Sequence, residues 1–143
     1  MPGPYTIDAS VFLNAFNPYE AGHEESRRLL ARLQEEAIPI VVPTLLLPEV
    51  AGAIARGRRD ARLARQFASA LNRLPHLVLV PVDATLARRA ADIAAQHGLR
   101  GSDAVYATVA ILFGSTLVTL DREQLQRVAG ILPTRRPKEV RHD

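Results

Sequence analysis

The sequence predicts an α/β fold, specifically a three-layer α/β/α sandwich around a mainly parallel central sheet. Short β-branched apolar runs alternate along the chain with segments whose apolar residues recur every three or four positions. Strands that are separated by helices favour parallel pairing, with helices on both faces of the sheet. No repeat, linker or low-complexity stretch divides the 143 residues, so we expect a single domain over residues 1–143.

The first half of the chain is expected to hold two strands and three helices. They are a strand that ends at Asp8, an amphipathic helix over 24–36, a strand over 38–42 and helices over 44–56 and 60–74. Thr44 and Asp60 should begin the last two helices, because side-chain oxygens of this kind accept hydrogen bonds from free helical N–H groups. Pro48 then falls near the first turn of its helix, where a missing N–H costs least.

The second half is expected to hold the remaining strands and helices. They are a strand over 76–82, helices over 83–97 and 102–113, a strand over 115–120, a helix over 121–130 and a short edge strand over 131–133. Asp83 should cap the first of these helices, and Gly98 should close it. The segment 102–113 is apolar nearly all round, which predicts a buried helix. The polar end, 134–143, is expected to be flexible, so that the core covers residues 5 to about 130.

Composition excludes several function classes. The chain has no cysteine, which excludes disulfides, thiolate metal sites and cysteine nucleophiles. It lacks a run of about 20 apolar residues and the pattern of a secretory signal, so we expect a cytoplasmic protein that does not enter a membrane. Arginine and lysine outnumber acidic residues by 18 to 15, and all but Lys138 of these cations are arginine. Arginine suits phosphate contacts, but genomic composition or thermal adaptation explains the excess equally well.

Four acidic residues stand in apolar surroundings, unlike the others. Asp8 and Asp121 follow predicted strands, at the carboxyl edge where open α/β sheets bind ligands. Glu49 and Asp103 fall in the first turns of helices that should begin near the same edge, where helix dipoles favour negative charge. Four acids that converge on one edge cannot all ionise without cations. Mg²⁺ or Mn²⁺, which prefer carboxylate and water oxygens, would supply the missing positive charge.

Each of these acids also has a structural interpretation. Asp8 would cap the turn after the first strand, and Asp121 would cap the helix that follows it. Asp103 would complement a helix dipole behind a Ser102 cap. Glu49 would pair with an arginine one or two turns later. The placement of all four on one predicted edge favours the functional interpretation.

The basic residues are densest just after the Glu49 helix. This run consists of Arg56, Arg58, Arg59, Arg62 and Arg65. An RNA-backbone contact, a solvated helix face and a contact with an acidic partner segment are all open interpretations. Arg100 would either reach a substrate phosphate or neutralise the acids. The histidines are scattered, which disfavours both a general base and the paired spacing of a zinc hydrolase; they are His23, His76, His97 and His142.

Four segments, taken in order, resemble the PIN domain and are especially similar to the compact PIN ribonucleases that serve as VapC-type toxins in toxin–antitoxin pairs. They are TIDASVFL, PTLLLPEVAGAI, GSDAVYATVA and LVTLDREQL, and the match extends from residue 5 to about 130. Any one segment is a weak signal, whereas the four at these spacings are specific. Leu125 departs from the family pattern, because many relatives carry an aromatic residue a few positions after the last acid.

The resemblance implies a metal-binding acidic site whose members are Asp8, Glu49, Asp103 and Asp121. Ser10 matches the family's hydroxyl two residues after the first acid, and Thr119 matches the threonine two residues before the last. Both would hydrogen-bond the carboxylates or metal-bound water. The resemblance also implies RNA cleavage that leaves 5′-phosphate and 3′-hydroxyl ends, a homodimer, and an antitoxin that inserts a segment into the acidic groove.

Together these observations predict a Mg²⁺- or Mn²⁺-dependent endoribonuclease that acts as the toxin of a VapBC-type pair. A PIN-fold RNA-processing factor is one alternative. A non-catalytic RNA- or protein-binding module is another, although a pure scaffold gains nothing from four clustered acids. A flavodoxin-like nucleotide-binding or phosphotransfer domain is disfavoured, because the segment DASVFLNAF after the first strand holds no glycine for a phosphate loop.

Overall fold

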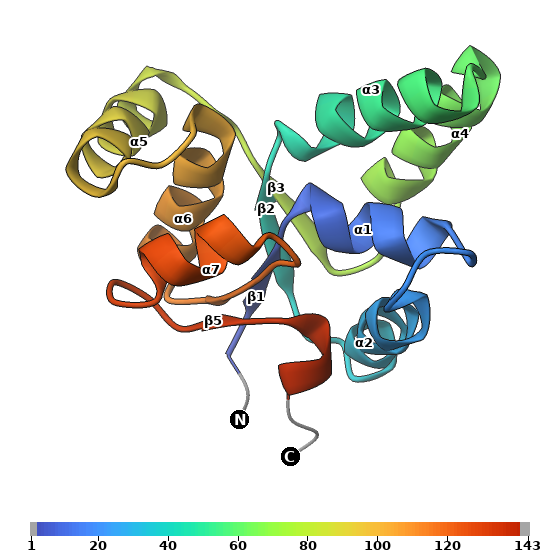
Figure 1. Ribbon diagram of the computed structural model, residues 1–143, viewed down its shortest axis with the longest axis horizontal. Helices are drawn as coiled ribbons and strands as arrows, with labels where there is room; N and C mark the ends of the chain where they lie inside the picture. Colours follow the sequence, from blue (N-terminus) through green and yellow to red (C-terminus); the bar gives the residue numbers. More distant parts are fainter. Residues whose placement is uncertain (1–2, 141–143) are drawn as a thin grey trace.

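A five-stranded parallel sheet forms the centre of the computed structural model, which describes residues 3–140 (Figure 1). Its strands are β1 (Tyr5–Ile7), β2 (Ile40–Pro43), β3 (Leu77–Val80), β4 (Thr116–Val118) and β5 (Thr134–Arg135). They lie in the order β3-β2-β1-β4-β5, and every neighbouring pair is parallel. The predicted parallel sheet is therefore confirmed.

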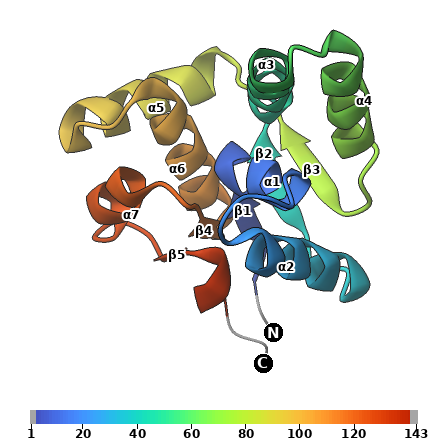
Figure 2. The same cartoon turned by 45° about the vertical axis from the view of Figure 1, so that its right-hand side comes forward.

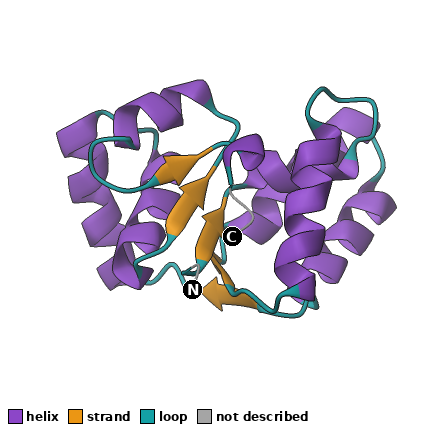
Figure 3. Cartoon of the chain, turned by 90° about the horizontal axis from the view of Figure 1, so that it is seen from below, coloured by secondary structure: helices purple, strands orange, loops and turns teal. Residues whose placement is uncertain are grey.

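Helices cover both faces of this sheet. They are α1 (Ala9–Phe16), α2 (His23–Glu35), α3 (Leu46–Arg58), α4 (Ala61–Asn72), α5 (Ala84–His97), α6 (Gly101–Phe113), α7 (Arg122–Val128) and the 3₁₀ helix η1 (Pro137–Glu139). Helices α1 to α4 pack on one face, and α5 to α7 pack on the other (Figures 2 and 3). This arrangement confirms the predicted three-layer sandwich. Among the described residues, no helix has the length and apolarity that a membrane crossing requires.

The strand order places a topological switch point between β1 and β4. The chain runs from β1 outward to β2 and β3, then returns through α5 and α6 to place β4 on the other side of β1. Ligands of open α/β sheets bind at the carboxyl ends of the strands that meet at such a point. The two segments stay paired beyond the strands, since the backbone N–H of Asp8 donates to the carbonyl of Val118 at 3.1 Å.

The core explains why the central strands read as continuous apolar runs. All residues of β1 and β2 are buried, and Ile7, Val42 and Leu117 have no exposed surface. Strands covered by helices on both faces lack the alternation of half-exposed strands. Helix α6 packs directly on β1, β2 and β4, so its buried residues form the centre of the molecule.

The helix caps test the expected boundaries. Asp60 and Asp83 begin α4 and α5 as predicted, each accepting from the backbone N–H three residues later, at 3.0 and 2.9 Å. Gly98 closes α5 in the left-handed conformation, with φ +64°. The Thr44 cap is wrong, because α3 begins two residues later without a side-chain cap. The Thr44 hydroxyl instead accepts from the Val82 N–H at 3.3 Å, which joins the segments that follow β2 and β3.

The expected position of the last strand is wrong. This strand is Thr134–Arg135 rather than 131–133, and η1 follows it. Pro137 and Val140 are buried, so the segment expected to be a flexible tail contributes to the core. The segment is polar in part because its short edge strand, β5, has a half-buried and an exposed side chain. Residues 141–143, with His142, lie outside the described part of the chain.

Two further departures concern helices. Helix α1 was not predicted: no element was expected between the strand that ends at Asp8 and the helix over 24–36, although α1 occupies residues 9–16. Helix α6 is buried over its middle, but its last turn exposes three apolar side chains, Ile111, Leu112 and Phe113. An apolar composition does not distinguish a fully covered helix from one whose last turn is left uncovered.

A buried polar junction fixes α1, the helix that Asp8 caps, against α2. The Asn14 side chain is fully buried, and its amide donates to the Glu20 carboxylate and the Ala21 carbonyl, both at 2.9 Å. Its carbonyl accepts from the Ser26 hydroxyl at 2.6 Å. Every polar atom of this amide group is thus paired inside the protein.

We expect Asn14→Ala to lower the free energy of unfolding by about 1–3 kcal/mol, because it leaves the buried Ser26 hydroxyl and Ala21 carbonyl without their partner. Urea unfolding followed by circular dichroism measures the change. Gln96→Ala, on the exposed face of α5, is the control and should stay within about 0.5 kcal/mol of the unmodified chain. Equal stability of the two variants would contradict the prediction.

Candidate functional site

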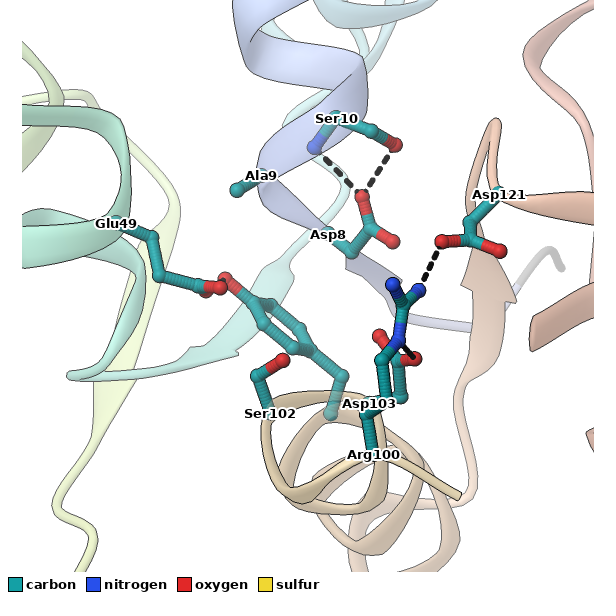
Figure 4. Close-up of a pocket in the computed structure, with 9 residues that line it drawn as sticks. Asp8, Ala9, Ser10, Glu49, Arg100, Ser102, Asp103 and Asp121 are labelled. Atoms are coloured by element: carbon teal, nitrogen blue, oxygen red, sulfur yellow. Dashed lines mark hydrogen bonds and ion pairs between the residues drawn. The ribbon is translucent and has the colours of Figure 1, made fainter. Parts of the chain in front are cut away.

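A cavity of about 240 Å³ opens at the carboxyl edge of the sheet, beside the switch point (Figure 4). It is lined by Asp8, Ala9, Ser10, Glu49, Arg100, Ser102, Asp103, Tyr106 and Asp121. The four acids that were expected to converge therefore line one cavity. They arrive from the β1–α1 junction, the first turn of α3, the first turn of α6 and the loop before α7.

Asp8 is the most buried of the four acids, with 6% of its surface exposed. Its Oδ1 accepts from the backbone N–H and the hydroxyl of Ser10, at 2.7 and 2.5 Å, and its Oδ2 accepts from the Thr119 hydroxyl at 2.5 Å. Burial raises the pKa of Asp8, and the hydrogen bonds from Ser10 and Thr119 oppose that rise. These bonds hold the carboxyl group in one orientation.

Both hydroxyls are themselves oriented by the loop that follows β4. Ser10 Oγ accepts from the Leu120 N–H at 3.1 Å, and Thr119 Oγ1 accepts from the Asp121 N–H at 3.0 Å. Each hydroxyl therefore directs its single proton to Asp8. Ser10 and Thr119 do hydrogen-bond a carboxyl group, while their support of a metal site stays a prediction.

Arg100 bridges the acids on the other side of the cavity. Its Nε donates to Asp103 Oδ2 at 2.9 Å, and its Nη2 donates to Asp121 Oδ2. Burial raises the pKa of Asp103, and the contact with Arg100 opposes the rise. Burial also acts on Asp121, but the backbone N–H of Gln124 and the Arg100 guanidinium outweigh it and lower the Asp121 pKa. Of the two roles considered for Arg100, the structure shows the neutralising one.

Glu49 reaches the cavity from the opposite layer and contacts no cation of residues 3–140. The Tyr106 hydroxyl donates to Glu49 Oε1 at 2.7 Å, across the boundary between α6 and α3. Burial raises the pKa of Glu49, the Tyr106 hydrogen bond lowers it, and the charges of Asp8 and Asp103 raise it further. Burial also raises the pKa of the Tyr106 phenol, so that this side chain is a neutral donor.

The acids share the cavity without forming a ready-made ion cage. Within residues 3–140, no three acidic or histidine side chains are placed so that they could hold a metal ion together. Arg100 lies between two of the acids, and Glu49 is turned to Tyr106. The donor chemistry nevertheless fits a hard divalent cation, since four carboxyl groups face one guanidinium and burial raises the pKa of three of them.

The other candidate residues lie away from the cavity. Arg56 and Arg58 are in the last turn of α3, and Arg59 follows it, all exposed to solvent. The Arg58 guanidinium lies over the Phe16 ring, 5.4 Å from its centroid. The ion pairs of the described residues do not involve these three arginines. None of the described histidines lines the cavity.

The sequence did not lead us to two residues that contact the candidate acids. Tyr106 lines the cavity, and its hydroxyl donates to Glu49. Gln124 is fully buried, and its side-chain amide donates to the backbone carbonyl of Asp103 at 3.2 Å while its own N–H donates to Asp121. Each lies three residues after a candidate acid, on the same face of its helix, and this spacing could have identified both.

The structure is similar to VapC20 from Mycobacterium tuberculosis, described as a Sarcin-Ricin loop cleaving toxin, with TM-score 0.73, 21% identity, and coverage of 96% of this chain and 99% of that chain. It is also similar to FitAcB from Neisseria gonorrhoeae, with TM-score 0.71, 18% identity, and coverage of 95% of this chain and 99% of that chain. A chain of a toxin–antitoxin complex from Klebsiella pneumoniae is similar with TM-score 0.66, 19% identity, and coverage of 96% of this chain and 100% of that chain.

The sequence itself gives the family. No curated protein matches it significantly, but the family model of the PIN domain matches residues 5–131, which is most of the chain. The four acids of the cavity fall within this match, as does the whole sheet except β5. The resemblance expected from the four sequence segments is thus confirmed, and the chain belongs to the PIN domain family.

Proposed function

We propose that this chain is a divalent-metal-dependent endoribonuclease and the toxin of a VapBC-type toxin–antitoxin pair. One observation supports this most directly: four carboxyl groups from segments far apart in the sequence line a single cavity at the switch point of a PIN domain. The metal would be Mg²⁺ or Mn²⁺, both of which prefer oxygen ligands. The proposed site of reaction is this cavity.

Asp8, Glu49, Asp103 and Asp121 are the proposed metal ligands. When bound, a divalent ion lowers the pKa of a water nucleophile and relieves charge on the phosphoryl oxygens. Ser10 and Thr119 keep the Asp8 carboxyl oriented by donating one hydrogen bond each. Arg100 competes with a cation for the charge of Asp103 and Asp121, and its exposed side chain can contact a substrate phosphate when one of these ion pairs opens.

The proposed partners follow from charge and from the structural neighbours. Arg56, Arg58 and Arg59 offer guanidinium groups without acidic partners in the described chain, which suits the backbone of RNA. Toxin–antitoxin complexes among the similar structures support an antitoxin partner. The exposed apolar end of α6 supports a homodimer. The cytoplasm remains the proposed location.

Alternative functions predict a different role for the acids. A PIN-fold RNA-processing factor would share the chemistry but have no antitoxin. A non-catalytic binding module would neither require a divalent ion nor lose function when one acid is neutralised. The hydrogen bonds at Asp8 favour catalysis over the binding module, since the cap of α1 needs only Oδ1, whereas the Thr119 hydroxyl orients Oδ2 as well.

We expect the chain to cut single-stranded or looped RNA in the presence of Mg²⁺ or Mn²⁺. Asp8→Asn should reduce the cleavage rate by about 100-fold or more, because loss of a metal ligand should cost at least as much activity as loss of a residue that orients one. EDTA should abolish cleavage. Gel analysis of the products with 5′-end labelling measures the rate. Asp83→Asn, which alters only the cap of α5, is the matched control. Metal-independent cleavage, or full activity of Asp8→Asn, would overturn the assignment.

We expect stabilisation by Mn²⁺ to increase with pH. Burial raises the pKa of Asp8, Glu49 and Asp103, so in the metal-free protein the stability linked to these groups is lost as pH rises through their raised pKa values. A cation needs the ionised form and should restore this stability. The increase in Tm on Mn²⁺ addition should therefore be larger at about pH 7.5 than at about pH 5, where ordinary carboxyls are already ionised. Calorimetric melts test this, and an increase independent of pH would contradict it.

We expect Arg100→Ala to bind Mn²⁺ roughly 3- to 10-fold more tightly than the unmodified chain, because the guanidinium competes for Asp103 and Asp121. The effect is limited by screening, since the Arg100 side chain is 61% exposed. Isothermal titration calorimetry at constant pH measures it. Arg88→Ala, on the exposed surface of α5, is the control and should leave the affinity unchanged. Weaker binding by Arg100→Ala would show that this arginine does not compete.

A further inference from the structure

Glu49 is held differently from the other acids of the cavity. Asp8 accepts hydrogen bonds from two hydroxyls, and Asp103 and Asp121 share the Arg100 guanidinium. Among the described residues, Glu49 has one hydrogen-bond donor, the Tyr106 hydroxyl at 2.7 Å. The orientation of this carboxyl group therefore depends on one neutral side chain from another helix.

Tyr106 is well suited to fix another group. Only 2% of its surface is exposed, and it belongs to the buried middle of α6, the helix that packs on β1, β2 and β4. Tyr106 lines the cavity, and its hydroxyl donates to the Glu49 carboxyl group there. The backbone of Ala9, next to Asp8, opposes the rise of the phenol pKa.

We propose that Tyr106 is a positioning residue that acts through Glu49 and sets this acid for cation binding, an inference that rests on the proposed function. The hydroxyl donates to Oε1, and Oε2 has no donor among the described residues. A cation that enters the cavity can bind Oε2 while the hydrogen bond stays in place. Arg100, by contrast, competes with a cation for the charge of Asp103 and Asp121, so the two side chains act in opposite directions on the affinity.

The physical advantage is preorganisation. A glutamate side chain has several rotamers, and a ligand that is already ordered loses less conformational entropy when a cation binds. The Tyr106 ring cannot follow a moving carboxyl group, because the core surrounds it. If Tyr106 served only to fill the core, phenylalanine would replace it without effect on the acids. Core filling and positioning of Glu49 therefore predict different results when the hydroxyl oxygen of Tyr106 is removed.

The first test is Tyr106→Phe, which removes only the hydroxyl oxygen. Mn²⁺ affinity measured by isothermal titration calorimetry should fall about 10-fold, the lower range for loss of a group that orients a metal ligand. RNA cleavage should recover when Mn²⁺ is raised, since the ligand itself is retained. Tyr5→Phe, on buried strand β1 away from the cavity lining, is the matched control and should bind Mn²⁺ as the unmodified chain does.

The second test asks whether the effect passes through Glu49. In a Glu49→Ala background, adding Tyr106→Phe should change Mn²⁺ affinity no further, because the acid that the hydroxyl orients is gone. Glu49→Asp keeps the charge but shortens the side chain, so it should lose about as much affinity as Tyr106→Phe. This variant leaves the core untouched and stays informative if Tyr106→Phe unfolds.

Three outcomes would overturn the inference. Unchanged Mn²⁺ affinity in Tyr106→Phe removes the proposed role, and so does an equal loss in the Glu49→Ala background, which would indicate a general effect on the fold. Both leave the unmodified chain binding Mn²⁺ and cutting RNA, so the proposed function survives them. Failure of the unmodified chain to bind Mn²⁺ would instead reject the proposed function, and the role of Tyr106 with it.

Discussion

Four carboxyl groups that share one cavity with a single guanidinium determine how the rest of this site is built. Burial makes each ionised acid costly, and the acids also raise one another's pKa values. The protein meets this cost with different donors at each position: hydroxyls at Asp8, Arg100 at Asp103 and Asp121, and a phenol at Glu49. Only Arg100 among them carries charge. The site therefore keeps a deficit of positive charge that a divalent cation would relieve.

The parallel sheet is what allows such a concentration of acids. Because β1 and β4 are neighbours at the switch point, the loops that follow them lie side by side, and Ser10 and Thr119 can both reach Asp8. Helices α3 and α6 come from opposite layers, yet both begin at this edge, so Glu49 and Tyr106 meet across the boundary. Gln124 ties the start of α7 to the first turn of α6. Apart from the contact of Ser10 with Asp8, each of these contacts joins residues that are distant in the sequence.

The sequence was sufficient to predict the sheet, the layers and the four acids, because strand ends and helix starts in a parallel α/β fold converge by rule. It was insufficient to predict which side chain each acid contacts. Nothing in the spacing says that Arg100 bridges Asp103 and Asp121, or that Glu49 contacts Tyr106 rather than an arginine one or two turns later, since rotamers are set by tertiary contacts. The ordered end at Val140 was missed for a related reason: polar composition describes a solvated edge as well as a flexible tail.

The capping interpretation of Asp8 and Asp121 is confirmed, and it is compatible with the functional one, because each cap uses only one carboxyl oxygen. Asp121 uses Oδ1 to accept from the Gln124 N–H at the start of α7, which leaves Oδ2 directed at Arg100. Asp8 likewise caps α1 with Oδ1 and presents Oδ2 to Thr119. A capping aspartate has a nearly fixed side-chain geometry, because one oxygen must reach a free helical N–H. The cap thereby directs the second oxygen of each aspartate, which Thr119 holds at Asp8 and Arg100 holds at Asp121.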